Sequence, residues 1–538
     1  MSETRPSQIS AGIVETVIRN GNVADVASAT LVKRDVGISG DRIVALVEPG
    51  RLAGERVVDA SGCVVSPGFV DIHSHSDTFP LIDPSARSKL CDGVTTEIAG
   101  NCGFSPFPAR GPERKQEQRE ADRYGLVVDW TNAQEFFERA ERAGSAINRG
   151  YLVGHGRVRA VVMGYENRPP TVQELAAMRA EVASALKTGA LGLSSGLAYA
   201  PGCFCGADEL TALCRVVAEH GGLYSTHMRS EGDGLERAVE EALTVGKASG
   251  ARLQISHVKT TGQRNWRKIS WLKDRLFRAR EEGVDVTCDR YPYIAGSTGL
   301  HFVLPDWAKE GGPEAELKRL ADSFTRKKVA EAVAANYPDP ASWQRIVVSC
   351  VPGAANKRYE GKCVAEIARL TGSDPISAVF DLLTAEKLDV DAIIFSMCEE
   401  NLREILTWPF VAIGSDASFR CPNGPLSEGK PHPRAYGTFS RVLRRYVREQ
   451  GVLGLVEALR KMTLLPAQRA GLARRGAIEK GWFADIVVFD PAAVEDRASF
   501  EDPHQCSKGI EYVFVNGKMA VNQGVPLGGL HGAILRRT

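Results

Sequence analysis

The sequence predicts an α/β fold, in which a (β/α)8 barrel of the TIM type is joined to a small β-sandwich domain built from both chain ends. Three observations predict it. Eight short apolar runs alternate with helical stretches along the middle of the chain, and both ends carry β-rich segments broken by turns. A long interval, residues 292–410, separates the last two apolar runs and indicates an insertion between strands seven and eight.

The chain is large enough for this architecture. It has 538 residues, 43% of them hydrophobic, whereas a single core rarely grows beyond ~250–300 residues. We expect a catalytic barrel over residues 67–470. The small β-domain should combine residues 1–66 with residues 471–538, because domain termini often lie near each other.

The two halves of the small domain share one pattern. In residues 13–65, turn-forming pairs such as Asn20-Gly21 interrupt short apolar runs. The same pattern returns in residues 481–490 and 513–518. These segments predict hairpins of one shared β-domain.

The barrel strands are predicted from the apolar runs. They are residues 69–75, 94–101, 150–154, 189–194, 222–228, 253–258, 284–291 and 411–416. The connecting segments favour helices; in residues 235–243, for example, Leu235, Val239, Ala242 and Leu243 fall on one face. The insertion, predicted at about residues 301–390, contains the charged stretch 307–334, and an insertion at a barrel rim is expected to cover the active site.

Charge and composition limit the kinds of partner that the protein can bind. Lys and Arg number 67 against 66 Asp and Glu, so no field of one sign gathers nucleic acid or an anionic membrane, and a small molecule fits better. Residues 1–10 lack the features of a signal peptide and no run of about 18 apolar residues follows, which predicts a soluble, cytoplasmic protein. The twelve scattered cysteines are typical of free thiols, with room for one ligand. The oligomeric state stays open.

Six residues able to bind a metal sit at the C-terminal tips of the predicted strands, at the end where a barrel keeps its chemistry. His73 and His75 end strand one, Cys102 follows strand two, and the others, each at the end of its own predicted strand, are His227, His257 and Asp416. A His-x-His pair alone fits an ordinary strand equally well, although alternation places both rings on one face. Six such residues at equivalent positions indicate a metal site, and imidazole, thiolate and carboxylate ligands suit zinc. His155, in a Gly-His-Gly segment, favours a local hydrogen bond over a role at the site.

Several motifs resemble the amidohydrolase superfamily, specifically its N-acyl-D-amino-acid deacylase, or D-aminoacylase, branch. The His-x-His motif of residues 68–77 is shared by the whole superfamily, whereas Gly-Asn-Cys-Gly-Phe-Ser at residues 100–105 is more specific to this branch. The other matching segments are residues 93–99, 192–202, 291–298, 413–416 and 432–434. The resemblance covers nearly the whole chain.

The resemblance implies a tightly held zinc on Cys102, His227 and His257, with a second, weaker metal position on His73, His75 and Asp416. Relatives that hydrolyse cyclic amides often carry a carboxylated lysine on strand four, but residues 190–194 contain no lysine. This absence argues against a hydantoinase or dihydropyrimidinase. A metal-bound Cys102 thiolate is the plausible substitute.

The implied reaction is hydrolysis of the amide bond of an N-acyl-D-amino acid. Zinc lowers the pKa of bound water toward ~7 and polarises the carbonyl, and Asp416 would act as general base and then general acid. Arg434 is the first candidate for the α-carboxylate, because a guanidinium binds a carboxylate in bidentate fashion. Possible helpers are Tyr199 and Ser297, while Lys259 or Arg290 could meet an acidic substrate side chain.

Other functions stay open at this point. A dipeptidase acting on peptides with a C-terminal D-residue would use the same scissile bond and the same carboxylate anchor. Another amidohydrolase, such as a cyclic amidase, and a non-catalytic scaffold are weaker alternatives. The scaffold predicts lost ligands, yet all six candidate ligands are present.

Overall fold

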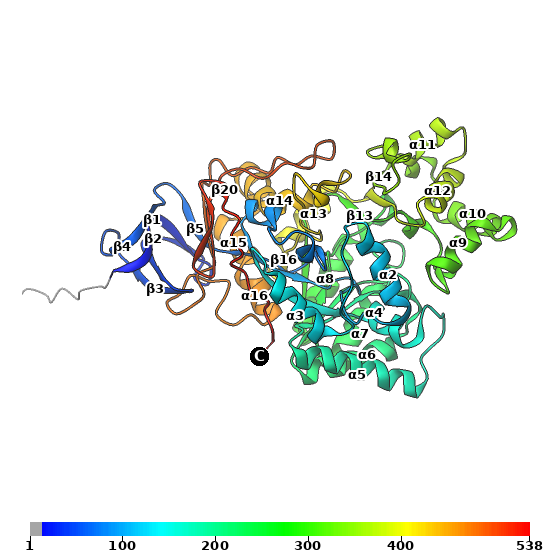
Figure 1. Cartoon of the computed structure of the whole chain (residues 1–538), viewed down its shortest axis with the longest axis horizontal. Helices are drawn as coiled ribbons and strands as arrows, with labels where there is room; N and C mark the ends of the chain where they lie inside the picture. The colour runs from blue at the N-terminus through cyan, green and yellow to red at the C-terminus, as the bar shows by residue number, and fades with distance from the viewer. Residues whose placement is uncertain (1–12, 538) are drawn as a thin grey trace, which may run out of the picture.

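The computed structural model describes residues 13–537 (Figure 1). The start of the first domain half, including the ten residues inspected for a signal peptide, lies outside this range. Within it, a β-domain, a central barrel and a third lobe follow one another along the longest axis of the molecule (Figure 1). No helix of the described range combines the length and apolar character that crossing a membrane requires.

The barrel consists of eight parallel strands in the described chain, each of which overlaps one of the predicted runs, although the first and the last are shorter than predicted. The strands are β6 (Phe69–Asp71), β7 (Val94–Ala99), β8 (Asn148–Gly154), β9 (Gly192–Gly196), β10 (Leu223–His227), β11 (Arg252–Ile255), β12 (Val286–Arg290) and β16 (Val411–Ile413). They pair in sequence order, and a parallel bridge from Ser74 to Ala417 joins the last strand to the first. The predicted (β/α)8 barrel is confirmed.

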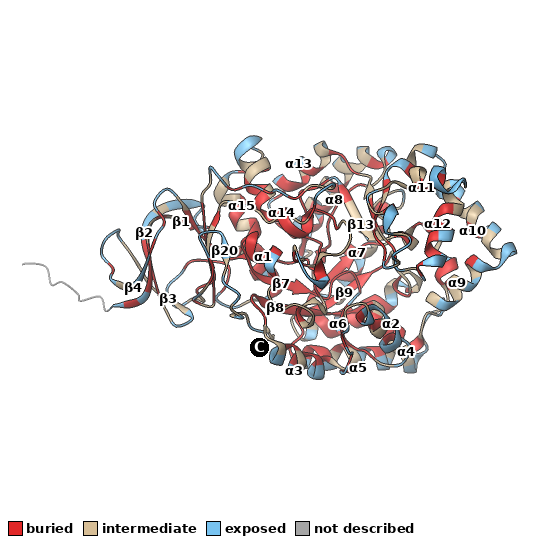
Figure 2. Ribbon diagram, turned by 45° about the horizontal axis from the view of Figure 1, so that its top comes forward, coloured by how far each residue is buried: buried red, intermediate tan, exposed pale blue. Residues whose placement is uncertain are grey.

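Helices cover the outside of the barrel. They are α1 (Arg87–Cys91), α2 (Gly111–Asp122), α3 (Ala133–Ala143), α4 (His155–Met163), α5 (Val172–Thr188), α6 (Ala207–Glu219), α7 (Leu235–Ser249), α8 (Ile269–Glu281), α14 (Arg434–Arg441), α15 (Leu455–Met462) and α16 (Leu464–Ala470). The face predicted for α7 is the buried one, since Leu235, Val239, Ala242 and Leu243 all belong to the main core. Figure 2 shows the buried residues gathered on the strands and on the inner faces of these helices.

Both chain ends form one β-domain, as predicted. Its strands are β1 (Val14–Asp25), β2 (Thr30–Ser39), β3 (Arg42–Val47), β4 (Gly54–Asp59), β5 (Val64–Pro67), β17 (Ile486–Phe489), β18 (Ile510–Val515), β19 (Lys518–Asn522) and β20 (Val525–Pro526). Strands β5 and β17 lie side by side, with Val65 opposite Val488, and so join the two ends. A bulge in β1 between Ile18 and Gly21 separates its pairing with β4 from its pairing with β5.

The described strands of this domain make one nine-stranded sheet with its own hydrophobic core. Ile18, Ile43 and Phe514 pack together in that core. The opposite side of β17 packs against the barrel, where Phe489 contacts Phe69 at a ring separation of 6.4 Å. The β-domain is therefore fixed to the start of the first barrel strand.

The insertion between β12 and β16 forms the third lobe. It contains a three-stranded antiparallel sheet and its own hydrophobic core. Its elements are β13 (Ala295–Gly299), α9 (Pro313–Ala321), α10 (Ser323–Asn336), β14 (Ile346–Cys350), α11 (Val364–Thr371), α12 (Pro375–Ala385) and β15 (Asp391–Phe395), and α13 (Glu399–Thr407) returns the chain to the barrel. The sheet uses residues on both sides of the expected range 301–390. The charged stretch 307–334 is mostly the helix pair α9 and α10.

Candidate active site

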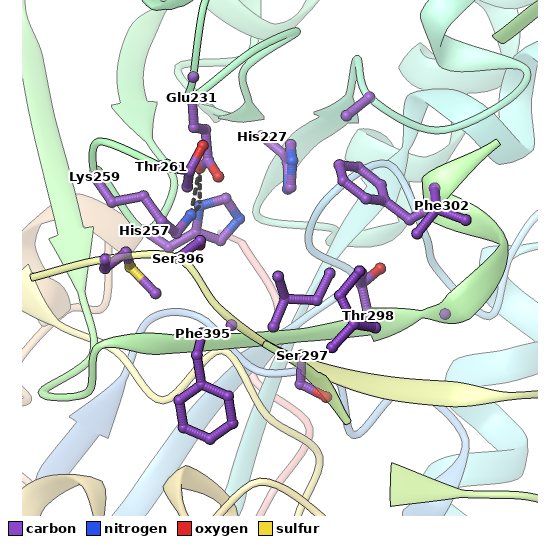
Figure 3. Close-up of a pocket in the computed structure, with 18 of the residues that line it drawn as sticks. His227, Glu231, His257, Lys259, Thr261, Ser297, Thr298, Phe302, Phe395 and Ser396 are labelled. Atoms are coloured by element: carbon purple, nitrogen blue, oxygen red, sulfur yellow. Dashed lines mark hydrogen bonds and ion pairs between the residues drawn. The ribbon is translucent and has the colours of Figure 1, made fainter. Parts of the chain in front are cut away.

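A cavity of about 1560 Å³ lies at the carboxyl ends of the barrel strands. The barrel contributes His75, Cys102 and Asp416 to its wall, and the insertion contributes Phe302 and Tyr337. The insertion therefore covers the site, as its length predicted. Figure 3 shows part of this wall, with His227 and His257 near the barrel and Phe302, Ser297 and Thr298 on the insertion side.

One group of candidate ligands surrounds Cys102. The Cys102 Sγ lies 3.3 Å from His73 Nε2 and 3.5 Å from His257 Nε2. Asp416 Oδ1 lies 3.3 Å from His73 Nε2 and 3.1 Å from His75 Nε2. These five side chains come from four different strand ends and meet at one point, which the spacing along the sequence alone does not show.

A second group overlaps the first at His257. The rings of His227 and His257 are 4.5 Å apart, and Glu231 Oε1 lies 2.8 Å from His257 Nδ1. His227 Nδ1 is buried with no hydrogen-bond partner among residues 13–537. The structure thus brings all six predicted ligands together and adds Glu231.

The backbone turns three of these side chains into the cavity. Cys102, His257 and Asp416 have φ values of 54°, 36° and 52°, in the left-handed region that residues other than glycine seldom adopt. Each lies just beyond a strand. Gly103 follows with φ +80°, and a Cβ there would lie 2.7 Å from Gly196 N. Such strain concentrates at functional sites because the surrounding structure must hold it.

Two carboxylates that the sequence analysis missed hold the histidines in place. Asp289 Oδ1 lies 3.0 Å from His73 Nδ1, and it also accepts a hydrogen bond from the backbone N of His257 at 2.8 Å. Glu231 Oε1 lies 2.8 Å from Nδ1 of His257, and the same nitrogen lies 2.7 Å from Lys259 Nζ. In both rings the other nitrogen, Nε2, faces Cys102. Carboxylates that bind the outer nitrogen of a histidine are typical of metal sites.

Charge in the cluster favours the anionic forms of its ligands. Burial opposes ionisation of Cys102, but His73 and His257 hold the pKa of its thiol well below the usual range. Burial likewise opposes ionisation of Asp416, whereas the Arg434 guanidinium and then His257 hold the pKa of that carboxyl well below its usual range. Metals bind the deprotonated forms of both groups.

Arg434 lies directly behind Asp416. Its Nη1 donates to Asp416 Oδ2 at 2.7 Å, its Nη2 donates to Ser297 O at 3.3 Å, and Cζ lies 4.6 Å from the ring centre of Tyr291. Its Nε is buried and has no partner in the described part of the chain. Tyr199 OH accepts a hydrogen bond from Thr298 Oγ1 at 3.2 Å. The three residues Arg434, Tyr199 and Ser297 all line the cavity.

The remaining sequence candidates behave differently. Lys259 lines the cavity but forms an ion pair with Glu231. Arg290 is 1% exposed and donates to Tyr293 O at 2.8 Å, and it does not line the cavity. The expectation that Arg290 meets a substrate side chain is therefore wrong. His155 Nε2 is hydrogen-bonded to Glu209 Oε1 at 2.7 Å, in line with the local role favoured for it.

The comparisons with known proteins agree with this site. The model of the amidohydrolase family matches residues 56–521. N-acyl-D-glutamate deacylase from Alcaligenes xylosoxydans xylosoxydans is 36% identical over 97% of each chain, and N-acyl-D-aspartate deacylase from the same organism is 34% identical over 92% of this chain and 91% of its own length.

A solved structure extends the likeness to the fold. N-acyl-D-glutamate deacylase from Bordetella bronchiseptica was crystallised with zinc and a phosphonate inhibitor that mimics the tetrahedral intermediate of the reaction. It is 34% identical to this chain, superimposes with a TM-score of 0.83, and the match covers 98% of this chain and 100% of that one. The chain therefore belongs to the amidohydrolase family, and within it to the N-acyl-D-amino-acid deacylase branch.

Proposed function

We propose that the protein is a zinc-dependent hydrolase that cleaves the amide bond of N-acyl-D-amino acids and releases a D-amino acid and a carboxylate. The observation that carries the proposal is the meeting of six candidate ligands at the mouth of the barrel, in a cavity large enough for such a substrate. The deacylases of Alcaligenes and Bordetella, at 34–36% identity over nearly the whole chain, support the choice of substrate.

The donor set fits zinc. Nitrogen, sulfur and oxygen ligands lie together, and His227 offers a buried nitrogen without a partner in residues 13–537. We propose that Cys102, His227 and His257 hold the tight ion and that His73, His75 and Asp416 form the second, weaker position. A bound zinc would polarise the substrate carbonyl and favour ionisation of an attacking water.

The protein's own groups would then carry the proton and position the substrate. Asp416 would take the proton of the attacking water and pass it to the leaving nitrogen, which lets the amide bond break. Arg434 would bind the α-carboxylate through its free Nε and an adjacent Nη, with its plane held against Tyr291. Ser297 and Tyr199 would complete that side of the pocket.

A stereochemical screen tests the proposal. The zinc-loaded enzyme is incubated with N-acetyl-D-amino acids and with their L-enantiomers, and release of the free amino acid is measured. We expect turnover of D-substrates and little or none of the L-forms. Equal rates for both enantiomers, or no turnover of either, would contradict the proposal. Peptides with a C-terminal D-residue in the same screen test the dipeptidase alternative, which predicts that they are the better substrates.

We also propose that the enzyme works in the cytoplasm. All twelve cysteines lie within the described residues and are free. Free thiols in this number suit a reducing compartment.

A further inference from the structure

One side of the cavity is an aromatic wall made of Phe104, Tyr199 and Phe302. The rings of Phe104 and Tyr199 are 5.3 Å apart, and those of Tyr199 and Phe302 are 6.0 Å apart. Phe104 is 40% exposed, and that exposed surface faces the cavity that it lines. Figure 3 labels Phe302 and His227 among the residues that line this cavity.

The aromatic wall is connected to the candidate metal ligands on one side and to Arg434 on the other. The ring of Tyr199 lies 4.8 Å from that of His227, and Phe104 follows Cys102 by two residues. Thr298 donates a hydrogen bond to Tyr199 OH, and the carbonyl of the preceding residue, Ser297, accepts one from Arg434. A group bound against the wall is therefore close both to the metal ligands and to the proposed anchor of the α-carboxylate.

Apart from Arg434, which the proposed function assigns to the α-carboxylate, the cavity offers almost no unpaired positive charge within the described residues. Of the Lys and Arg side chains that line it within the described residues, all but one have a carboxylate within 4 Å. The pairs are Arg229–Glu241, Lys259–Glu231, Arg264–Asp233, Lys309–Asp306, Arg345–Asp339 and Arg434–Asp416. The exception, Arg420, lies over the ring of Phe79, 5.3 Å from its centre. The cation nearest to the aromatic wall is Lys309, whose Nζ lies 5.7 Å from the ring centre of Phe302 and is already paired with Asp306 at 3.4 Å. An acidic substrate side chain against the wall would therefore lose water and would have to compete with Asp306 for its partner.

We infer that the aromatic wall binds the side chain of the D-amino acid, so that the enzyme prefers N-acyl-D-amino acids with apolar or aromatic side chains over acidic ones. The inference rests on the proposed function. It commits to the side chain because the side chain and the α-carboxylate share one carbon atom, and because Thr298, which donates to Tyr199, directly follows Ser297, whose carbonyl accepts from Arg434. The acyl group lies one bond further away, beyond the nitrogen.

The substrate series that tests this holds the acyl group constant. We expect kcat/KM for the N-acetyl derivatives of D-methionine, D-leucine and D-phenylalanine to exceed that for the N-acetyl derivatives of D-aspartate and D-glutamate by about 10- to 200-fold, the range that apolar pocket contacts give. Equal or better hydrolysis of the acidic substrates overturns the inference while leaving the proposed function intact. Failure to hydrolyse any N-acetyl-D-amino acid overturns both.

Substitutions in the aromatic wall test whether the wall causes the preference for apolar side chains. Phe302→Ala should lower the ratio of kcat/KM for N-acetyl-D-phenylalanine to that for N-acetyl-D-alanine by about 10-fold or more. The matched control is Phe324→Ala, because Phe324 belongs to the same insertion, is 68% exposed and does not line the cavity. It should leave the ratio unchanged. An unchanged ratio in Phe302→Ala overturns the inference. The inference is also overturned if the loss of kcat/KM in Phe302→Ala depends on the length of the acyl group in an N-acyl-D-alanine series and not on the size of the side chain.

Discussion

His73 and Asp289 are hydrogen-bonded across the barrel, with 3.0 Å between His73 Nδ1 and Asp289 Oδ1. They are 216 residues apart in the sequence and both are buried. Since an ionised carboxylate can only accept, Nδ1 carries a proton, and Nε2, which faces Cys102 and Asp416, is the nitrogen that could bind a metal once it loses its own proton. Asp289 therefore sets the tautomer of a candidate metal ligand.

Replacing Asp289 with Asn should weaken binding of the second metal by about 10- to 100-fold, because the amide NH₂ group favours the wrong tautomer of His73. Equilibrium dialysis against zinc, with circular dichroism to show that the variant is folded, measures the change. Asp35→Asn is the control: Asp35 is equally buried and accepts two backbone N–H groups, but it lies in the β-domain. Unaltered zinc binding in folded Asp289→Asn would contradict this role.

Replacing Cys102 should mainly remove zinc, whereas replacing His73 should mainly remove activity. Cys102→Ser takes away the only thiolate of the proposed tight site, so the purified variant should contain little zinc. His73→Asn should keep the tight ion yet lose most of its activity, since His73 lies between Cys102 and Asp416. Metal content by atomic spectroscopy and kcat on the same preparations separate the two effects. The opposite pattern would place the tight ion on the His-x-His strand.

Asp416→Asn should lower kcat by about 10²- to 10⁴-fold, the usual contribution of a general acid or base, while the tight zinc stays bound. Both the rate and the metal content are measured. Asp233→Asn is a suitable control, because Asp233 also lines the cavity but is paired with Arg264. A rate near that of the wild type in Asp416→Asn would remove Asp416 from the mechanism.

Arg434→Met should raise KM about 10-fold or more for a substrate with a free α-carboxylate, because a hydrogen bond between charged groups is lost. The α-amide of the same substrate should show a smaller change. Since Arg434 also touches Asp416, kcat should fall for both substrates. Arg345→Met removes another cavity arginine, which pairs with Asp339 at 3.6 Å, and serves as control. Equal KM changes for acid and amide would contradict the anchor.

The position of the ligands could be predicted from the sequence because parallel barrel strands end at one rim. Any metal-binding residue that directly follows a strand is then near every other such residue. This is why His227 and Asp416 could be grouped although 188 residues lie between them in the chain. The buried face of α7 could also be predicted, because its apolar residues recur with the period of an α-helix.

The partners of those ligands could not be predicted in the same way. Asp289 and Arg290 are neighbours at the end of β12, and alternation along a strand sends them to opposite sides. The sequence does not reveal which of them faces inward; the structure turns Asp289 toward His73 and Arg290 toward Tyr293. Lys259 looked free because its partner, Glu231, lies in another loop.

Lys461 gives a pH-dependent prediction for stability. It is fully buried beneath the barrel, donates to Val411 O at 3.1 Å, and burial lowers its pKa to about 8, against 10.5 for an ordinary lysine, despite the nearby Glu457. Between these two values the unfolded chain binds more protons at this residue than the folded protein does. The lysine's contribution to the free energy of unfolding should therefore rise by up to about 3 kcal/mol as the pH increases from 8 to 10.5.

The difference between wild type and Lys461→Met isolates this contribution, because other titrating groups cancel. Chemical denaturation at pH 7, 8, 9 and 10 should show the difference in unfolding free energy moving in favour of the wild type above pH 8 and staying level below it. The exposed Lys480, changed to Met, is the matched control. Were the wild-type advantage to stay constant over the whole range, Lys461 would have to keep an ordinary affinity for its proton, and burial would not be the dominant influence on it.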